Sequence, residues 1–381
     1  MTQHSILRLG LVGGGPGSFI GPVHRMAACL DSRFTLTAGA FSRNTDKSRA
    51  QAVAWGVAPD RAYDGIEAML AGEAEREDGI QAVAIATPNH SHFAIAKAAL
   101  EAGLPVICDK PMTATLDEAE ALAPIVAASG KPFALTYTYT GYAMIREARA
   151  RIAAGAIGRV RKIMVEYPQG WLSEAIEGSN QQASWRTDPD RAGQGGAIGD
   201  IGVHAFQLAE YVTALRVTEL VADLPRVVPG RQLDDDCNTL LRFAGNVPGV
   251  LTASQISTGE RNGLRLRVYG EKGGIEWDHN APGDLTLLWP DARTEILHSG
   301  GPDLDETAQA ATRLPSGHPE GFIEAFATLY SDFADAISGD RSKADGLLPG
   351  ITDGLRSMRF VDLAVRSNTA RGWLPFPGET Q

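Results

Sequence analysis

A carboxylate and an imidazole stand four residues apart in a glycine-rich stretch near the middle of the chain. Asp200 and His204 belong to residues 195–204, which read Gly-Gly-Ala-Ile-Gly-Asp-Ile-Gly-Val-His. If a helix begins at Asp200, His204 lies one turn later on the same face, since side chains four residues apart are neighbours on an α-helix. Imidazole changes its charge near neutral pH, so such a pair suits proton transfer. A single histidine on a helix is more often a structural residue, and these residues alone leave both interpretations open.

A glycine-rich turn follows the first apolar run. Residues 9–12 read Leu-Gly-Leu-Val, and residues 13–21 read Gly-Gly-Gly-Pro-Gly-Ser-Phe-Ile-Gly. Glycine permits positive φ and removes the Cβ that would block a pyrophosphate, and a helix after Gly21 would direct free N–H groups at the anion. The spacing departs from G-x-G-x-x-G, because five residues separate Gly15 from Gly21. A plain tight turn is the default, but a position between an apolar strand and a helix favours dinucleotide binding. The expected contacts are Gly13, Gly15, Gly17, Ser18, Phe19, Ile20 and Gly21.

The end of the second apolar run bears on which dinucleotide fits. An acidic residue about 20 positions after the glycine turn normally binds the ribose 2′-hydroxyl. Here residues 41–44 read Phe-Ser-Arg-Asn. No carboxylate is present there to repel a 2′-phosphate, and Ser42 and Arg43 could bond one, so a small preference for NADP over NAD is expected. The alternative is that Arg43 is solvated or stacks on adenine.

Two further polar clusters follow apolar runs of strand length. Residues 87–92 read Thr-Pro-Asn-His-Ser-His, and residues 108–111 read Cys-Asp-Lys-Pro. Ligands of open α/β sheets bind outside the carboxyl ends of the strands, so these loops should contact the cofactor. The expected contacts are Thr87, Pro88, Asn89, His92, Asp109 and Lys110.

Plainer explanations exist for several of these residues. Lys110 could be a surface charge before a turn proline. His90 and His92 lie two apart without a Cys or carboxylate partner, so no metal site is expected. His92 is expected to cap the following helix or to lie near the cofactor. The acidic run at 234–236 is most simply the solvated start of a strand.

The elements that must position these side chains alternate over the first 137 residues. Strand-length apolar runs lie at 7–12, 35–41, 81–87, 104–108 and 132–136, and helical patterns lie at 23–30, 45–55, 92–102 and 116–128. Runs that are apolar throughout indicate strands covered on both faces. Thr115 and Glu118 form a capping-box pattern at one helix start. The alternation predicts an α/β Rossmann domain over residues 1–137, with a doubly wound parallel sheet.

Residues 138–381 predict a second, α+β domain. Two-residue alternation at 264–269, with similar runs at 160–167, 219–228, 239–243, 250–256 and 274–278, predicts a large, open, mostly antiparallel sheet with one polar face. Helices are expected at 142–153, at 351–365 and along the stripe from Phe322 to Phe333, which Pro319 can open. The polar stretches 169–196 and 299–317 are predicted as long loops that could wall a substrate site.

Net charge and cysteine content bear on the partners and the cellular compartment of the protein. A net charge of −11 without blocks of like charge argues against a nucleic-acid or anionic-membrane partner. The three cysteines, Cys29, Cys108 and Cys237, are odd in number and far apart, which is not typical of a disulfide framework. The chain shows neither a signal-peptide pattern nor an apolar run of about 18 residues. A cytoplasmic protein is therefore expected.

Taken together, the motifs resemble the Gfo/Idh/MocA oxidoreductases, a family named for glucose-fructose oxidoreductase and inositol dehydrogenase. The shared marks are the glycine turn ending Gly21-x-x-His24, the Thr-Pro-x-x-x-His run from Thr87 to His92, the Lys-Pro pair at Lys110, and the Gly-Gly-x-x-x-Asp-x-x-x-His segment ending at His204. Asp109 replaces the usual Glu before Lys110, and three residues are inserted in the glycine turn.

The resemblance implies hydride transfer between a secondary hydroxyl of a sugar, glycoside or inositol and the nicotinamide of NAD(P). By analogy, His204 is the base that takes the hydroxyl proton, and Lys110 hydrogen-bonds the reacting oxygen. Asp200 would bind a neighbouring hydroxyl or orient the imidazole. Weaker candidates for substrate contact are Tyr139, Trp185, Arg186 and His318, for which packing or capping is equally expected.

The resemblance also implies a homodimer or homotetramer, because the open sheet of family members usually packs on a second copy. Two rival functions stay open. One is a redox-neutral enzyme that retains its dinucleotide and isomerises, transfers or cleaves a sugar through a keto intermediate. The other is a non-catalytic nucleotide-sensing protein that kept the fold.

Overall fold

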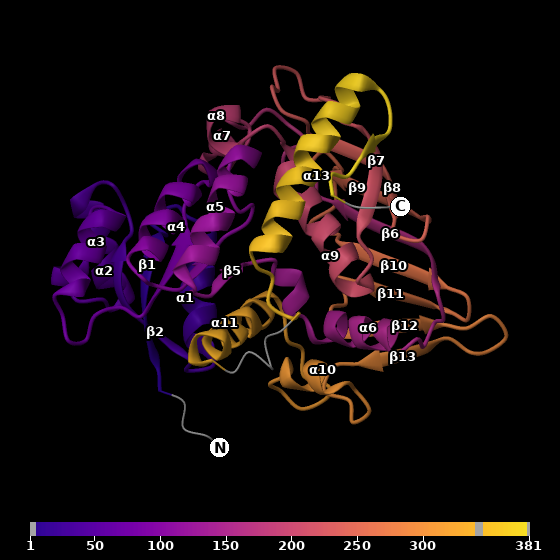
Figure 1. Cartoon of the computed structure of the whole chain (residues 1–381), viewed down its shortest axis with the longest axis horizontal. Coiled ribbons are helices and arrows are strands. Elements are labelled where there is room, and N and C mark those ends of the chain that lie inside the picture. The colour runs from indigo at the N-terminus through magenta and orange to yellow at the C-terminus, as the bar shows by residue number, and fades with distance from the viewer. Residues whose placement is uncertain (1–4, 340–345, 379–381) are drawn as a thin grey trace. The chain divides into compact units, whose positions relative to one another are not determined.

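The computed structural model describes residues 5–339 and 346–378, and its contacts divide the chain into two compact units (Figure 1). The first comprises Met1–Thr138 and Phe326–Leu355, and the second comprises Tyr139–Ala325 and Arg356–Gln381. The sequence pattern predicts two continuous domains, whereas the contacts return a late segment to the first unit. The reason is aromatic packing: the rings of Tyr330 and Phe333 lie 5.5 and 5.9 Å from the ring of Phe34. The functional division between residues 1–137 and 138–381 stays a prediction.

The first unit contains a five-stranded parallel sheet in the order β2-β1-β3-β4-β5. Its strands are β1 (Leu7–Gly13), β2 (Phe34–Ala40), β3 (Ala82–Ala86), β4 (Val106–Cys108) and β5 (Phe133–Leu135). Every residue of β3 is buried, as expected for a strand covered on both faces. The predicted doubly wound sheet is confirmed. Successive strands are added on one side of β1 and then, from β3 onward, on the other, and ligands of such sheets bind at this switch point between β1 and β3.

Helices connect these strands close to where the sequence predicts them. They are α1 (Ile20–Leu30), α2 (Thr45–Trp55), α3 (Ile66–Ala74), α4 (His92–Glu101) and α5 (Leu116–Ser129). The capping box is confirmed, since Thr115 Oγ1 accepts from the Glu118 N–H and the Glu118 carboxylate accepts from the Thr115 N–H. The short helix α3 is absent from the sequence prediction.

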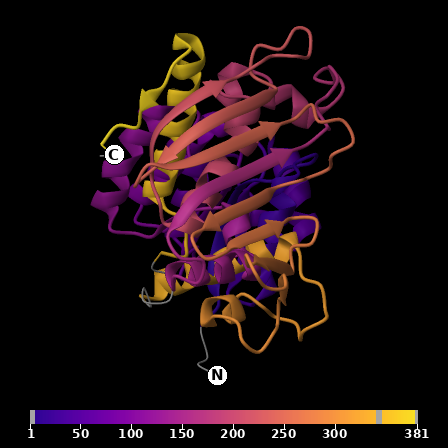
Figure 2. The ribbon, with the colours of Figure 1, turned by 90° about the vertical axis from the view of Figure 1, so that its right-hand side faces the viewer.

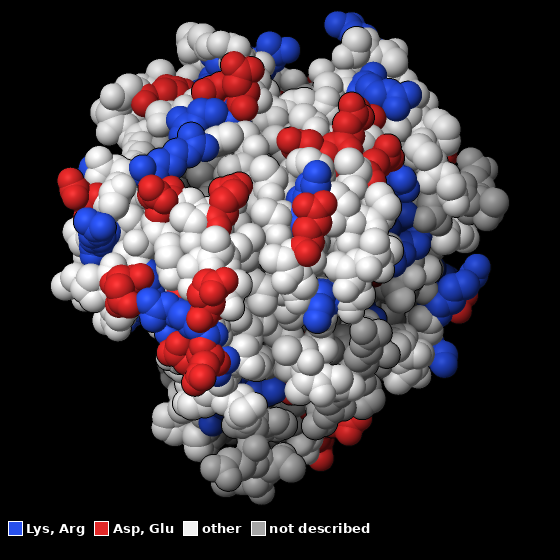
Figure 3. All heavy atoms as spheres, turned by 60° about the vertical axis from the view of Figure 1, so that its left-hand side comes forward, with Lys and Arg blue, Asp and Glu red and all other residues white. Residues whose placement is uncertain are grey.

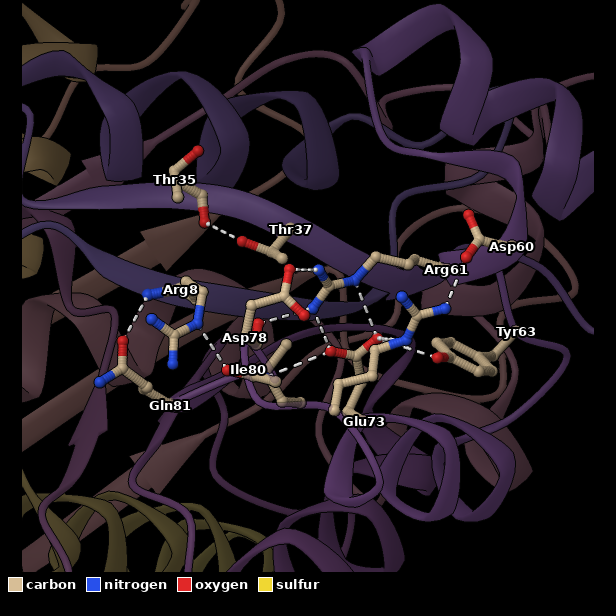
Figure 4. Close-up of polar contacts among 12 residues, drawn as sticks. Arg8, Thr35, Thr37, Asp60, Arg61, Tyr63, Glu73, Asp78, Ile80 and Gln81 are labelled. Atoms are coloured by element: carbon tan, nitrogen blue, oxygen red, sulfur yellow. Dashed lines mark hydrogen bonds and ion pairs between the residues drawn. The ribbon is translucent and has the colours of Figure 1, made fainter.

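A buried ion-pair network supports the edge of this sheet where β1 and β3 begin (Figure 4). Arg61 pairs with Glu73, a residue of α3, and its Nη1 lies 2.8 Å from Asp78 Oδ2. Glu73 also accepts from the Tyr63 hydroxyl at 2.8 Å and from the Ile80 N–H at 3.2 Å. Arg61 and Glu73 are only 6% and 3% exposed, so each charge depends on its partner. The network lies at the edge opposite the glycine turn.

The second unit contains a nine-stranded sheet in the order β13-β12-β11-β10-β6-β9-β8-β7-β14. Neighbours pair antiparallel except β6 and β9, which are parallel, so the predicted mostly antiparallel sheet is confirmed. Leu266 and Val268 are buried while Arg265 and Arg267 face the other side. Figure 2 shows that second side, with no helix across it. The strands are β6 (Val160–Pro168), β7 (Val217–Asp223), β8 (Asp236–Phe243), β9 (Val247–Ser254), β10 (Arg265–Gly270), β11 (Gly274–Asp278), β12 (Asp284–Leu288), β13 (Glu295–His298) and β14 (Leu374–Pro375).

The central helix of this unit, α9 (Val203–Thr213), is buried at every residue and packs against β6, β9 and β10. A π-helical turn (Ile198–Gly202) leads directly into it. The remaining helices are α6 (Ala143–Ala153), α7 (Gln181–Arg186), α8 (Pro189–Ala192) and α10 (Glu306–Ala310), with α11 (Phe322–Ser338) and α13 (Ile351–Ala370) running through the unit boundaries.

Three local predictions are wrong. The stretches 169–196 and 299–317 are not continuous loops, because they contain α7, α8 and α10. Pro319 does not open α11, which begins three residues later; there the Glu324 carboxylate accepts from the Gly321 N–H at 2.9 Å. The strand expected to reach residue 228 ends at Asp223. Strands β12, β13 and β14 are absent from the sequence prediction.

The surface carries charges of both signs. On the face drawn in Figure 3, acidic and basic side chains are interspersed rather than gathered by sign. Within residues 5–339 and 346–378, no helix is long and apolar enough to cross a membrane.

Candidate functional site

The glycine turn after β1 is wedged between the ends of the two neighbouring strands. A Cβ on Gly13 would lie 2.4 Å from the carbonyl oxygen of Ala86, which ends β3, and Gly13 adopts a φ of +99°. A Cβ on Gly15 would lie 2.6 Å from the carbonyl oxygen of Phe41, just after β2. Side chains are therefore sterically excluded at both positions, and the turn presents backbone to a ligand.

The start of α1 packs on the same turn. A Cβ on Gly21 would lie 2.2 Å from the Cα of Gly14, so the helix can approach only because both residues are glycine. The inserted residues form a tight turn, in which the Ser18 N–H donates to the Gly15 carbonyl at 3.0 Å and Ser18 Oγ accepts from the Gly21 N–H at 3.2 Å. The first turn of α1 holds no acidic residue, which suits an anion at its positive end.

The other predicted contacts in this turn have distinct settings. Gly17 adopts a φ of +83°, Phe19 is 58% exposed, and Ile20 is the first residue of α1. The geometry suits a diphosphate, and the identity of each contacting residue stays a prediction.

The end of β2 holds the residues expected near the ribose. Ser42 Oγ accepts from the Asn44 N–H at 3.2 Å, and Asn44 caps α2 by accepting from the Lys47 N–H at 2.9 Å. Arg43 is exposed. Ser42 is thus held beside the glycine turn, while Asn44 serves the helix.

His92 joins the loops that follow β3 and β4. It is fully buried, and its Nδ1 and Nε2 each lie 2.8 Å from a carbonyl oxygen, that of Pro111 and that of Thr87 respectively. The prediction that His92 caps α4 is wrong, because Ser91 occupies the N-cap position. Ser91 Oγ instead donates to Thr87 Oγ1 at 2.8 Å, within a loop whose 3₁₀ turn begins at Asn89. His92 therefore fixes two of the expected cofactor loops to each other.

Asp109 and Lys110 follow β4 at the same edge of the sheet. The Asp109 N–H donates to the Ile85 carbonyl at 2.9 Å, and the Asp109 carboxylate accepts from Thr136 Oγ1 at 2.7 Å. Lys110 is half-buried. These bonds hold the backbone that carries the lysine.

A buried histidine lies behind this edge, and sequence reasoning treats it only as a family mark. His24 is fully buried, and its Nδ1 lies 2.7 Å from the hydroxyl of Tyr330. Burial lowers the pKa of His24 to about 4, against a smaller opposing effect of the Asp109 charge. His24 is therefore a neutral imidazole at physiological pH.

Asp200 lies inside a helical segment rather than at its first residue, because the π-helical turn Ile198–Gly202 leads directly into α9. Its Oδ2 accepts from Arg186 Nε at 3.2 Å and from Gln255 Nε2 at 2.8 Å. The Arg186 guanidinium lies over the ring of Trp185, 4.2 Å from its centroid. The structure thus brings three predicted site residues together, along with Gln255, which sequence reasoning missed.

His204 lies in the first turn of α9 and is 7% exposed. Its ring lies edge-on to the ring of Tyr139, with centroids 5.0 Å apart. Burial raises the pKa of Tyr139 to about 12, so its hydroxyl stays neutral beside the imidazole. Tyr139 and His204 thus lie together within the second unit, and substrate contact by Tyr139 stays a prediction.

A polar network extends from Tyr139. Its hydroxyl contacts the hydroxyl of Tyr167 and accepts from Asn262 Nδ2 at 3.1 Å, and the Tyr167 hydroxyl donates to Asn262 Oδ1 at 2.6 Å. His279 Nδ1 lies 3.0 Å from the Asn262 carbonyl oxygen. Tyr167, Asn262 and His279 follow or end separate strands, so only their places at strand ends could have indicated them.

Other candidates are placed elsewhere or serve the fold. His318 is exposed, with its Nδ1 3.0 Å from the Pro315 carbonyl oxygen, and its substrate contact stays a prediction. The solvated start of a strand expected at 234–236 is wrong, because Asp234 and Asp235 are 7% and 0% exposed. Across the described residues, no group of three or more His, Cys, Asp or Glu side chains could hold a metal ion.

Two protein-family models match this chain. The family described as "Oxidoreductase family, NAD-binding Rossmann fold" matches residues 7–137, and the one described as "GFO/IDH/MocA C-terminal domain" matches residues 145–276. The chain is 35% identical to the uncharacterized oxidoreductase YfiI of Bacillus subtilis (strain 168), over 97% of each protein.

Two further relatives carry more specific names. A crystal structure of an inositol dehydrogenase homolog complexed with NAD+ from Azotobacter vinelandii has 37% sequence identity and a TM-score of 0.94, covering 98% of each chain. Levoglucosan dehydrogenase of Pseudarthrobacter phenanthrenivorans (strain DSM 18606 / JCM 16027 / LMG 23796 / Sphe3) is 26% identical, over 97% of this chain and 98% of the relative.

Proposed function

The chain belongs to the Gfo/Idh/MocA family of NAD-binding oxidoreductases, and from this premise we propose that it oxidises a secondary hydroxyl of a sugar, a glycoside or an inositol. The observation that carries the proposal is the group around Asp200, where Arg186 and Gln255 donate to one carboxylate four residues before a buried imidazole. Such closely spaced donors and acceptors suit a ligand with several hydroxyls. The relatives named for inositol and levoglucosan support the same class.

The glycine turn fits the dinucleotide that this reaction needs. A Cβ at Gly13 or Gly15 would clash with the strand ends, so the turn is backbone without side chains at these positions, and α1 directs its positive end at it. When bound, the dinucleotide supplies a nicotinamide whose C4 accepts or returns a hydride. The loops after β3 and β4, joined by His92, would hold the nicotinamide half through Thr87, Pro88, Asn89, Asp109 and Lys110.

In this proposal, one side chain accepts the hydroxyl proton and another stabilises the charge on the hydroxyl oxygen. His204 takes the hydroxyl proton as the C–H electron pair leaves as hydride, so the alcohol becomes a ketone and the imidazole becomes imidazolium. Lys110 donates a hydrogen bond to the oxygen that develops alkoxide charge. Asp200 binds a neighbouring hydroxyl or orients the imidazole, with Tyr139, Trp185, Arg186 and His318 as the surrounding contacts. The meeting of Lys110 and His204 at one nicotinamide is part of this proposal.

The cofactor proposal extends to NADP in preference to NAD. Ser42 is held beside the glycine turn, Arg43 is exposed and able to reach a phosphate, and residues 41–44 contain no carboxylate. The similar structure of an inositol dehydrogenase homolog complexed with NAD+ supports the opposite choice. Steady-state rates with each dinucleotide separate the two: a higher kcat/KM with NADP supports the Ser42 and Arg43 assignment, and a higher value with NAD discards it.

Assembly and location complete the proposal. We propose a homodimer or homotetramer formed through the uncovered face of the nine-stranded sheet, which carries Leu240 at 49% exposure (Figure 2). A molar mass by light scattering equal to that of a single chain would contradict the proposed oligomer. A cytoplasmic location is proposed because all three cysteines are unpaired, which suits a reducing compartment.

The deciding experiment is a screen of sugars, glycosides and inositols with both dinucleotides, followed by absorbance of the reduced nicotinamide. We expect reduced dinucleotide in a one-to-one ratio to ketone product. Product without stoichiometric reduced dinucleotide would instead identify the redox-neutral enzyme. Dinucleotide binding without turnover of any polyol would favour the nucleotide-sensing protein.

A further inference from the structure

We propose that Asp234 is a positioning residue for Asp200 and His204, holding the start of the helical segment that carries both. The Asp234 side chain accepts from the Gly196 N–H at 2.6 Å through Oδ1 and from the Ile198 N–H at 2.8 Å through Oδ2. Its backbone carbonyl accepts from the Ala197 N–H at 2.9 Å. One residue thus receives three consecutive backbone donors. The proposal rests on the function proposed above.

The helical segment needs such an acceptor because it carries no cap of its own. The first N–H groups of a helix have no partner within the helix and are usually satisfied by a nearby Ser, Thr, Asp or Asn. Here the residues before the π-helical turn and before α9, Ala197 and Gly202, make no side-chain cap bond. The cap is supplied from 36 and 38 residues away in the sequence. A carboxylate is also the charge that the positive end of a helix favours.

The backbone around Gly196 packs closely against the backbone of Asp234. A Cβ on Gly196 would lie 1.9 Å from the carbonyl oxygen of Asp234, and a Cβ on Gly195 would lie 2.8 Å from Ile198 Cγ2. Gly196 therefore lets the backbone of Asp234 approach, and Gly195 lets the following helical turn pack on the chain before it. The glycine at position 196, four residues before Asp200, is thus explained by close contact with the Asp234 backbone.

The residue after Asp234 holds Asp200 from its other side. The Asp235 carbonyl accepts from the Gln255 N–H at 2.9 Å, and the Gln255 side chain donates to Asp200 Oδ2 at 2.8 Å. The Asp235 carboxylate accepts from the N–H groups of Val227 and Val228, which lie beyond the end of β7. The pair Asp234–Asp235 therefore fixes both the backbone before Asp200 and one partner of its carboxylate.

The Asp234 carboxylate is buried, so its charge depends on those N–H donors. Burial raises its pKa to about 6, opposed by the bonds from Ile198 and Gly196 and reinforced by the Asp235 charge. Residues 195–198 hold no titratable group, and on the β8 side its neighbours are Asp236 and the buried thiol of Cys237. Because this pKa lies above the ordinary value of 3.8, the closed segment takes up a proton more readily than the solvated one as pH falls through about 6.

Asp234→Asn tests the proposal, with Asp236→Asn as the matched control. The amide replaces one acceptor oxygen by an NH₂ group that faces a backbone N–H, so the helix start should shift. We expect kcat to fall on the order of ten- to hundredfold while dinucleotide Kd changes less than about twofold. Asp236, whose carboxylate accepts from Asn238 Nδ2 at 2.8 Å near the surface, should tolerate the change with kcat within about twofold. Equal kcat in both variants would overturn the proposal.

The pH profile separates positioning from a merely structural role. His204, as the proposed base, gives kcat an acid limb, and a displaced helix start should shift that limb in Asp234→Asn and leave it in place in Asp236→Asn. An unchanged acid limb in Asp234→Asn would assign the residue to stability alone.

Hydrogen exchange of the unaltered protein tests the cap without any substrate, so it stands apart from the proposed activity. Because the pKa of Asp234 is raised in the closed state, opening of this segment to water becomes costlier once the carboxyl is protonated. Protection of the amides of residues 196–198 should therefore rise as pH drops through about 6, after correction for intrinsic rates, while α9 residues Leu208–Val212 keep theirs. Constant protection at 196–198 would contradict the cap, including where Asp234→Asn does not fold. A protein with pH-sensitive protection but no polyol turnover would refute the proposed function and leave the cap in place.

Discussion

At the residue scale, the proposed base lies among neutral aromatic groups. His204 contacts the ring of Tyr139, whose hydroxyl is bonded to Asn262, and burial also raises the pKa of Tyr167. Hydroxyls that stay protonated cannot compete for the proton of the substrate. The groups beside Tyr139 that can take up a proton are then the imidazoles of His204 and His279, and burial lowers the pKa of His279.

Removing either proposed reacting group should abolish turnover and spare cofactor binding. We expect His204→Ala and Lys110→Ala each to lower kcat by about 10²- to 10⁴-fold, with dinucleotide Kd within about threefold. Stopped-flow turnover and fluorescence titration give the two quantities. His298→Ala, at an exposed histidine bonded to Asp284, is the control and should change neither. A His204→Ala enzyme within about tenfold of the unaltered kcat would remove the imidazole from the mechanism.

His24 should make the first unit less stable in mild acid. Its folded pKa of about 4 lies below its ordinary value of 6.5, so the unfolded chain binds more protons between these values. Stability is therefore complete above pH 6.5 and falls as pH drops toward 4, by about 3 kcal/mol. Urea unfolding across this range should show a shallower slope in His24→Gln. Identical slopes in the two proteins would mean that His24 is not held neutral.

At the element scale, the glycine turn and the loops at the ends of β3 and β4 do different work. The turn excludes side chains, whereas His92 ties the Thr87 and Pro111 carbonyls together. The glycines let the turn pack closely on the strand ends, and His92 keeps the loops after β3 and β4 in place.

Filling the turn should cost dinucleotide affinity. Gly15→Ala places a methyl group 2.6 Å from the Phe41 carbonyl oxygen, so the turn must move. We expect Kd for NADH and NADPH to rise about tenfold or more, measured by fluorescence titration. Gly65→Ala is the control, because its Cβ would meet only the end of the Glu67 side chain at 3.5 Å. Unchanged binding in Gly15→Ala would place the diphosphate elsewhere.

The network in Figure 4 should stabilise the first unit without touching catalysis. Arg61→Ala leaves Glu73 buried without its main partner, which should lower the free energy of unfolding by about 3–5 kcal/mol. Arg159→Ala, which breaks an exposed pair with Glu271, should cost less than about 1 kcal/mol. Urea midpoints measure both, and equal losses would show that burial of the pair is not what matters. The kcat of folded Arg61→Ala should stay near that of the unaltered enzyme.

At the scale of the whole molecule, periodicity and local motifs predict most elements, because their signals lie within a few residues. The capping box at Thr115 and the alternation around Leu266 are examples. The prediction fails where a partner comes from far along the chain. Asp234 and Asp235 look like a surface run in sequence, yet both accept backbone N–H groups in the interior.

The candidate site divides in the same way. Lys110, Asp200 and His204 follow from motifs, and Arg186, predicted only as a substrate contact, donates to Asp200. Gln255 and Asn262 were missed because nothing in their local sequence distinguishes them from ordinary polar residues at strand ends. Their contacts to Asp200 and Tyr139 arise only when distant strands are brought together.

The aromatic stripe of α11 has a practical consequence for dissecting the protein. Phe326, Tyr330 and Phe333 come late in the chain, yet they contact His24 and Phe34 near its beginning. A fragment ended at residue 137 would expose those two rings to solvent and should aggregate when produced by itself. Adding a separately made peptide that spans Phe326–Leu355 should restore the solubility of this fragment. The first unit is therefore best produced as two polypeptides that associate.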